Sequence, residues 1–335
     1  MNAEILFTHT PELFQKAVRC AAELLRAGEV VALPTETVYG LAANALDENA
    51  VAKIFQIKGR PAHNPIIVHV ASNEMAKACV AQWPELADKL SKSFWPGPLT
   101  LVLPRAEKIP DAVTAGGATV GVRWPSHPFM QAVIRECGFP LAAPSANLSN
   151  QISPTNAEHV RAQLGGKIPL IVDGGQSQVG IESTVLDLTV TPARILRPGM
   201  IHAESLAAVT GNLQPPTSNL QPPNLKSPGM LAKHYSPKAK LVVASWQNDG
   251  ELAAQIGNWK LEIGDVHIVA HTKIPTSFGA ANVSVIPHDA EAFARALYAE
   301  LHRCDAAGAK LIVVEAPPAA PGWSGIADRL RRAAA

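Results

Sequence analysis

The sequence predicts an α/β protein built from one large and one smaller domain. Its 335 residues exceed what a single hydrophobic core usually holds. Short apolar runs typical of buried strands alternate with stretches of helical period along most of the chain. Residues 212–229 instead change to Pro, Asn, Gln, Leu and Ser, a composition typical of a linker. We therefore expect a first domain over residues 1–211, a linker segment over 212–239 and a second domain over 240–335.

The composition excludes several classes of protein. Hydrophobic residues make up 47% of the chain and charged residues 17%, which is enough apolar material for buried sheets. The net charge of +1 provides no global basic field to hold a long nucleic acid. The four cysteines lie far apart without a CxxC pair, as is typical of reduced core residues. With no apolar run of membrane-spanning length and no signal-peptide pattern, we expect a soluble, cytoplasmic protein with no membrane contact.

The first domain is expected to begin with a helix that starts at Thr10 and Pro11 and closes at Gly28. A strand over 30–33 follows, and its continuous apolar run suits a strand covered on both faces. The remaining elements expected in this domain are helices over 49–58, 74–81, 84–93, 127–137 and 156–164, and strands over 66–70, before Pro104, before Arg123, and over 141–143, 170–173, 184–188 and 194–197. Ser126 is the expected cap of the helix over 127–137.

In the second domain we expect strands over 241–244, 266–270, 283–286 and 311–315, and helices near 251–256, over 290–302 and from Gly325. Strands that alternate with helices predict a small parallel α/β domain.

Polar residues follow the strand over 30–33, where Thr35, Glu36 and Thr37 lie at its carboxyl end. Ligands of open α/β sheets bind outside such ends. A helix cap would use the same residue types, so both interpretations stay open. His69, inside a predicted strand, fits either a hydrogen-bonded core histidine or a site residue.

Cations recur at the ends of predicted elements: Lys58 and Arg60 near a helix end, and Arg123 and Arg197 at strand ends. The sequence has neither a P-loop nor a dinucleotide fingerprint. A triphosphate carries about four negative charges, and separate Arg and Lys side chains from several strands can meet that charge. The alternative is that these cations are solvated.

The loop PSANLSNQISPT, over 144–155, is dense in hydroxyls and amides. Ser145, Asn147, Ser149 and Ser153 fit capping of the next helix as well as hydrogen bonding to a polar ligand. Both interpretations stay open.

Seven motifs occur in a fixed order: PTETVYGL, KGRPAHNPIIVHV, FWPGPLTLVLP, VGVRWPSHP, APSANLS, ESTVLDL and RPG. With them the chain resembles the Sua5/YrdC/YciO family, and its longer Sua5 type in particular, because the linker runs into SPGMLAKHYSP. One departure is Asn150, where the family pattern leads us to expect Gly. Asn tolerates a left-handed backbone better than most residues, so we expect the loop to keep its conformation.

The resemblance implies a YrdC-like catalytic domain with a twisted open mixed sheet, followed by a Rossmann-like Sua5 domain. It implies a nucleotidyltransferase that joins L-threonine, bicarbonate and ATP into threonylcarbamoyl-AMP and pyrophosphate, with Mg²⁺ on the phosphates and no metal ligand assigned to protein side chains. The product would serve a separate threonylcarbamoyl transferase in t6A modification of tRNA position 37, and the resemblance also allows a weak contact with tRNA.

The resemblance also implies roles for individual residues. The residues expected around threonine are Thr37, His69, Arg123, Ala143 and Ser183. The residues expected around ATP are Lys58, Arg60, Asn64, Thr119, Ser145, Ser153, Arg197 and Tyr235. Lys58 and Arg60 would carry catalysis by positioning and charge neutralisation, and Arg123 suits a carboxylate held by paired hydrogen bonds. The segment SPGMLAKHYSP would form a lid that brings Tyr235 to the nucleotide.

Two other functions are compatible with parts of the sequence. A carbamoyl-adenylate-forming enzyme would resemble the YrdC-like module of hydrogenase maturation proteins, but the chain lacks the zinc-type cysteine spacing of those larger proteins. A non-catalytic protein that binds double-stranded RNA fits poorly with the near-zero net charge.

Overall fold

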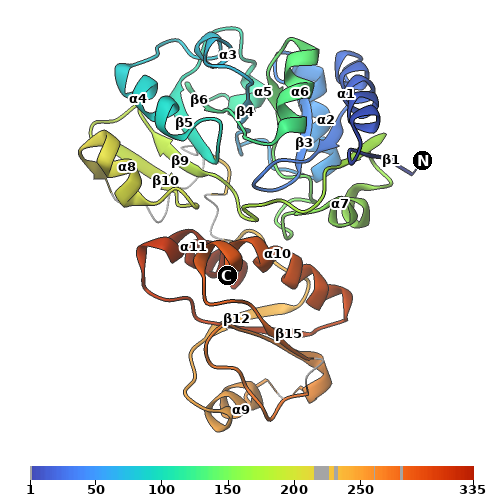
Figure 1. Cartoon of the computed structure of the whole chain (residues 1–335), viewed down its shortest axis with the longest axis vertical. Coiled ribbons are helices and arrows are strands. Elements are labelled where there is room, and N and C mark those ends of the chain that lie inside the picture. The colour runs from blue at the N-terminus through green and yellow to red at the C-terminus, as the bar shows by residue number, and fades with distance from the viewer. Residues whose placement is uncertain (1, 215–225, 230–232, 260, 280–281) are drawn as a thin grey trace. The chain divides into compact units, whose positions relative to one another are not determined.

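The computed structural model describes residues 2–214, 226–229, 233–259, 261–279 and 282–335 (Figure 1). The chain divides into two compact units. The first comprises residues 1–149 and 153–231, and the second comprises residues 150–152 and 232–335. The middle of the predicted linker, 215–225, and residues 230–232 of the predicted lid lie outside the described residues.

The first unit contains a mixed sheet in the order β1-β8-β2-β3-β7-β4-β6-β5-β9-β10-β11. Its strands are β1 Glu4–Phe7, β2 Val31–Leu33, β3 Gly40–Asn44, β4 Val68–His69, β5 Leu99–Pro104, β6 Thr119–Arg123, β7 Leu141–Ala142, β8 Leu170–Asp173, β9 Thr184–Asp187, β10 Ala193–Arg197 and β11 Leu213–Gln214. Its helices are α1 Pro11–Arg26, α2 Glu48–Lys58, α3 Asn73–Ala78, α4 Glu85–Phe94, α5 Asp111–Thr114, α6 Pro128–Cys137, α7 Ala157–Leu164 and α8 Ala203–Thr210.

The sheet differs from the prediction at four strands. Strands β1 and β3 were not anticipated, and β4 is shorter than the expected run over 66–70. Strand β11 lies inside the segment predicted as linker, where it pairs with β10 in parallel. The sheet of the first unit therefore extends past residue 211.

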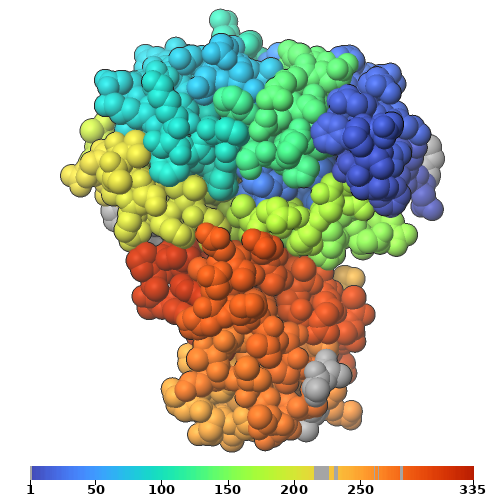
Figure 2. Space-filling model, viewed as in Figure 1, coloured from blue at the N-terminus to red at the C-terminus, as the bar shows by residue number. Residues whose placement is uncertain are grey.

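Successive side chains along a strand point alternately into two apolar cores, one on each face of the sheet. Ala32 of β2 belongs to the core on one face, while Val31 and Leu33 belong to the core on the other. Helices α1 and α6 pack against each other and contribute to that second core through residues such as Phe129. Figure 2 shows their outer surfaces, dark blue and green, next to each other. Both faces of the sheet are thus covered, as its apolar strands require.

Helix caps confirm one expectation and overturn two. Thr10 caps α1, because its hydroxyl accepts the Leu13 N–H at 3.3 Å. Helix α6 is capped by His127 and not by Ser126; the Nδ1 of His127 accepts the Phe129 N–H at 3.2 Å, and Pro128 occupies the first turn. Helix α7 is capped by Asn156, so the hydroxyl and amide side chains of 145–153 do not cap it.

The second unit is a parallel α/β domain, as predicted. Its sheet has the order β12-β15-β13-β14, and every pair is parallel. The elements are β12 Lys240–Ala244, α9 Asp249–Gly257, β13 Val266–Ala270, β14 Val283–Val285, α10 Ala290–Ala306, β15 Leu311–Glu315 and α11 Ser324–Ala333. Within this unit α10 and α11 lie on one side of the sheet and α9 on the other (Figure 1).

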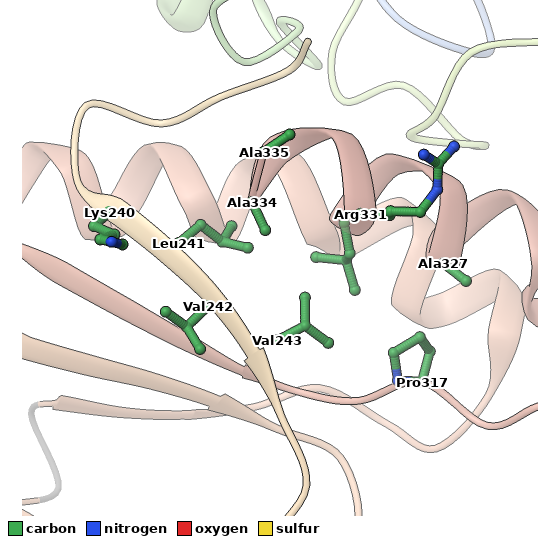
Figure 3. A pocket seen from close by; sticks show the side chains of 10 residues that line it. Lys240, Leu241, Val242, Val243, Pro317, Ala327, Arg331, Ala334 and Ala335 are labelled. Atoms are coloured by element: carbon green, nitrogen blue, oxygen red, sulfur yellow. The ribbon is translucent and has the colours of Figure 1, made fainter. Parts of the chain in front are cut away.

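A cavity of about 490 Å³ lies between β12 and α11 (Figure 3). Its walls are mostly aliphatic, including Leu241, Val243 and Leu330, and its cations are Lys240 and Arg331. None of the residues predicted to bind threonine or ATP lines it. The candidate active site is therefore elsewhere.

Asn150 adopts the left-handed backbone that the loop was expected to keep, with a φ of 66°. We expect Asn150→Val to lower the free energy of unfolding by about 1–2 kcal/mol, because a β-branched side chain is strained there. The matched variant Asn150→Gly should be as stable as the native chain, since Gly adopts positive φ freely. Chemical denaturation of both variants checks this, and equal stability of the two would contradict it.

Candidate active site

On one face of the sheet, paired residues of neighbouring strands are apolar in β7 and polar in β4 and β6. Leu141 of β7 belongs to the core of α1 and α6. In the next strands His69 pairs with Leu141, and Arg123 pairs with His69, so all three side chains share one face. His69 and Arg123 are almost completely buried, at 4% and 3% exposed. Gly121 lies two residues before Arg123 on the same face, and a Cβ there would come within 3.2 Å of Thr100 Cγ2.

Arg123 is fixed by the turn that follows β2. Its Nη1 donates to Thr37 Oγ1 at 3.0 Å, and its Nη2 lies 2.8 Å from Glu36 Oε1 in a buried ion pair. Its Nε donates to the Gly97 carbonyl at 3.3 Å. The Thr35 hydroxyl accepts the N–H groups of Thr37 and Val38, and the chain then enters β3. The helix-cap interpretation of these threonines is therefore wrong.

Glu36 is ionised in this setting. Burial acts to raise its pKa, but Arg123 and the Ser126 N–H outweigh burial, and the net result is a pKa below the usual value. The pKa of a glutamate in the unfolded chain is about 4.3, and the pKa of Glu36 in the folded protein is lower. The ionised carboxylate therefore stabilises the fold fully above about pH 4.3, and this stabilisation is lost as the pH falls through the pKa of the folded protein.

At neutral pH we expect the Glu36→Gln variant to have a lower free energy of unfolding than the native chain, because the native carboxylate pairs with Arg123. The difference should shrink once the pH falls below about 4.3 towards the folded pKa of Glu36. Denaturation curves of both proteins across this range measure it. A difference that stays constant with pH would show that the charge on Glu36 is not its source.

His69 is neutral. Burial, and then the charge of Arg123, lower its pKa to about 3. Its Nδ1 is buried without a hydrogen-bond partner among the described residues. It therefore differs from a core histidine whose hydrogen bonds are all satisfied, and a neutral imidazole beside Arg123 suits contact with a polar ligand.

Lys58 closes α2 and is 2% exposed. Its Nζ donates to the carbonyls of Ser145 and Asn147 at 2.6 and 2.5 Å, and lies 3.3 Å from Asn147 Oδ1. Burial, followed by the charge of Arg60, lowers the pKa of Lys58, while Glu182 opposes the change. The three oxygens favour the ammonium form. Lys58 thus anchors the loop over 144–149 in the described structure.

Arg60 and Asn64 lie in the loop that follows α2. The guanidinium of Arg60 donates to the carbonyls of Asn64 and Pro65 at 3.0 and 2.7 Å, which folds the loop back on itself. Asn64 is 1% exposed, and its side-chain Oδ1 has no hydrogen-bond partner among the described residues.

A second polar group joins the ends of β5, β9 and β10. Ser183 Oγ lies 2.8 Å from Thr100 Oγ1 and accepts from Arg197 Nη2 at 3.1 Å. Glu182 precedes Ser183 in the chain, and its Oε1 accepts a hydrogen bond from Ser153 Oγ at 2.5 Å. Arg197 also donates to the Pro228 carbonyl at 3.1 Å, which ties the start of the predicted lid to the first unit.

The remaining predicted residues are placed as follows. Ala143 is buried, and its N–H donates to the Ile67 carbonyl at 3.2 Å, next to His69. Thr119 is half-buried at the start of β6, four residues before Arg123. Tyr235 belongs to the second unit, where its ring packs 4.0 Å from His234 and 5.3 Å from the Arg329 guanidinium.

The sequence did not predict a role for three side chains that hold the two polar groups in place. Glu36 was placed at a strand end without a role, and it forms the ion pair with Arg123. Thr100 and Glu182 were not singled out. A signal was present for both, because Thr100 is a polar residue within the apolar run LTLVL and Glu182 is the one acid in GIESTV.

The described residues contain no group of three or more His, Cys, Asp or Glu side chains that could hold a metal ion. Among the same residues, no helix combines the length and apolar character needed to cross a bilayer.

Two family models match the chain. Residues 23–199 match the model of the Sua5/YciO/YrdC family, which carries the description "Telomere recombination". Residues 201–335 match the model "Threonylcarbamoyl-AMP synthase, C-terminal domain". The chain belongs to the Sua5/YciO/YrdC family. The resemblance drawn from the seven motifs is thereby confirmed.

Members of the Sua5/YciO/YrdC family resemble the chain over most of its length. The threonylcarbamoyl-AMP synthase of Pyrococcus abyssi is 41% identical and covers 94% of this chain and 93% of its own. The synthase of Bacillus subtilis is 48% identical over 71% of this chain and 68% of its own. The crystal structure of P. abyssi Sua5 complexed with L-threonine superposes with a TM-score of 0.91 at 39% identity, covering 100% of this chain and 98% of that one. The predicted Sua5-type fold, with a twisted mixed sheet and a second α/β domain, is confirmed.

Proposed function

We propose that this protein is a threonylcarbamoyl-AMP synthase that converts L-threonine, bicarbonate and ATP into threonylcarbamoyl-AMP and pyrophosphate. The observation that carries the proposal is the full-length likeness to an archaeal Sua5 solved with L-threonine. The buried group of Arg123, Thr37 and His69 supports it, because a cation, a hydroxyl and a neutral imidazole suit a zwitterionic amino acid.

Arg123 is proposed to hold the threonine carboxylate. Glu36, Thr37 and Gly97 fix the guanidinium plane before the substrate arrives, which lowers the cost of ordering it on binding. Ala143 and Ser183 would complete the threonine pocket.

The chemistry joins two steps. The threonine amine and bicarbonate form a carbamate with loss of water. A carbamate oxygen then attacks the α-phosphorus of ATP while the bond to pyrophosphate breaks. Lys58, Arg60 and Arg197 are proposed to neutralise the phosphates, with Asn64, Thr119, Ser145 and Ser153 contacting the nucleotide. The described residues offer no carboxylate cluster for Mg²⁺, so we propose that Mg²⁺ enters with ATP and assign no step to it.

The segment SPGMLAKHYSP is proposed to act as a lid that carries Tyr235 to the nucleotide and shields the water-sensitive carbamate. The contact of Arg197 with Pro228 and the 2.9 Å ion pair of Lys226 with Asp187 support anchoring of its base. We expect a chain that ends before Ser227 to keep its fold, judged by circular dichroism, and to lose most of its turnover. Full activity of this truncated chain would contradict the lid.

The product is proposed to pass to a threonylcarbamoyl transferase that modifies tRNA position 37, in the cytoplasm and with at most a weak contact between this chain and tRNA. Transfer from an adenylate releases AMP, so the acceptor adenosine needs no separate activation.

The experiment that tests the function is pyrophosphate release by the full chain with ATP, Mg²⁺ and bicarbonate, with and without L-threonine. Release that needs both threonine and bicarbonate is expected. Release without threonine would replace the proposal with a carbamoyl-adenylate-forming enzyme. No release together with tight binding of double-stranded RNA would replace it with a non-catalytic RNA-binding protein.

A further inference from the structure

A compact polar cluster lies at the carboxyl ends of the strands of the second unit. His271 and Thr272 follow β13 directly, His288 lies between β14 and α10, and Glu315 ends β15. Three atoms meet there: His271 Nδ1, His288 Nδ1 and Thr272 Oγ1. The two nitrogens are 3.0 Å apart, and the hydroxyl oxygen lies 2.8 and 2.6 Å from them. Carboxyl ends are where ligands of open parallel sheets bind.

The tautomer of His271 follows from its other ring nitrogen. Nε2 lies 3.2 Å from the Ala316 carbonyl, which can only accept a hydrogen bond. Nε2 therefore carries the hydrogen of the neutral ring, and Nδ1 presents a lone pair to His288 and Thr272. Histidines that bind metals are oriented in the same way, with the second ring nitrogen donating to a backbone carbonyl or carboxylate.

The cluster is rigid and negatively charged at its base. Glu315, 6% exposed, accepts the N–H groups of His271, Thr272 and Lys273 at 2.7, 2.8 and 3.1 Å. Its Oε2 is 3.8 Å from His271 Nδ1. The Trp323 ring packs 5.5 Å from both imidazoles. The loop is thus fixed, and a carboxylate charge lies beside the nitrogen lone pairs.

We propose that His271 Nδ1, His288 Nδ1 and Thr272 Oγ1 bind a divalent late transition-metal ion, with water completing its shell. Two imidazole nitrogens bound about 2.1 Å from one ion at a right angle are about 3.0 Å apart. Right-angled nitrogen and oxygen shells suit Ni²⁺ and Cu²⁺. The exposed ring of His288 gives the ion access from solvent. The site is separate from the residues proposed for catalysis, so it does not depend on the proposed activity.

The test is equilibrium dialysis of the full, tag-free chain against NiCl₂ near neutral pH, with bound nickel measured by elemental analysis. One ion per chain is expected. His288→Ala, which changes an exposed side chain, should weaken binding by about tenfold or more, and His271→Ala should do the same. His267→Ala is the matched control, because it removes another imidazole of β13 outside the cluster.

A second measurement keeps the outcome clear if His271→Ala does not fold. The visible absorption of bound Ni²⁺ or Cu²⁺ reports nitrogen ligands, and it should change in His288→Ala and stay unchanged in His267→Ala. Absence of nickel binding by the native chain would overturn the proposal. Binding that His288→Ala leaves intact, or that His267→Ala abolishes equally, would overturn it too.

Discussion

Lys58→Met is expected to lower threonine-dependent pyrophosphate release by about 10²–10³-fold, the scale on which a single preorganised charge contact acts. Methionine is unbranched and one atom shorter than lysine, and it removes all three donors. The carbonyls of Ser145 and Asn147 then lose their buried partner, and the loop over 144–149 keeps its backbone bond to α2, from the Ser149 N–H to the Lys58 carbonyl. Initial-rate measurements with saturating threonine and ATP report the effect.

The matched control for Lys58→Met is Lys53→Met, on the same helix. Lys53 is partly exposed and pairs with Glu29 at 2.8 Å, away from the candidate site. It should change pyrophosphate release little. A Lys58→Met enzyme with native turnover would show that neither the anchored loop nor the charge matters for the reaction.

Arg123→Met is expected to have the largest effect on stability, lowering the free energy of unfolding by about 3–5 kcal/mol, because it leaves the Glu36 carboxylate buried without its cation. Threonine binding should be lost as well. Denaturant unfolding measures the first effect, and titration calorimetry with L-threonine measures the second.

A double-mutant cycle separates the ion pair from other effects of Arg123. Glu36→Gln combined with Arg123→Met should be more stable than Arg123→Met alone, because the uncompensated buried charge is gone. Threonine binding should stay lost in the double variant. Equal stability of the single and double variants would mean that Glu36 does not depend on Arg123.

The ends of helices and strands in the candidate site were predictable where the sequence signal was local. Lys58 was predicted from a helix that stops at Gly59, and Gly59 does close α2 with a φ of 61°. Arg123 and Arg197 were predicted from cations at the ends of apolar runs, and both end strands. Strand ends and helix ends follow from residue type over a few positions.

What the sequence did not reveal depends on pairing between distant segments. The ammonium of Lys58 reaches carbonyls 87 and 89 residues further along the chain. Ser183 meets Thr100 across 83 residues, and His271 meets His288 across 17. Strand β3 was missed because GLAAN, rich in Gly and Ala, lacks the β-branched residues that mark strands. Such contacts depend on the order in which strands pair in the sheet. That order cannot be predicted from any single segment of the sequence.

The register that pairs His69 with Arg123 also makes this region sensitive to the length of the chain. Inserting one residue in β6 before Val122 would turn the side chains that follow it in this strand to the opposite face. Arg123 would then enter the apolar core that Val122 now fills, and Val122 would take its place beside Thr37. A one-residue insertion here would therefore disrupt both the packing of the sheet and the contacts that hold Arg123.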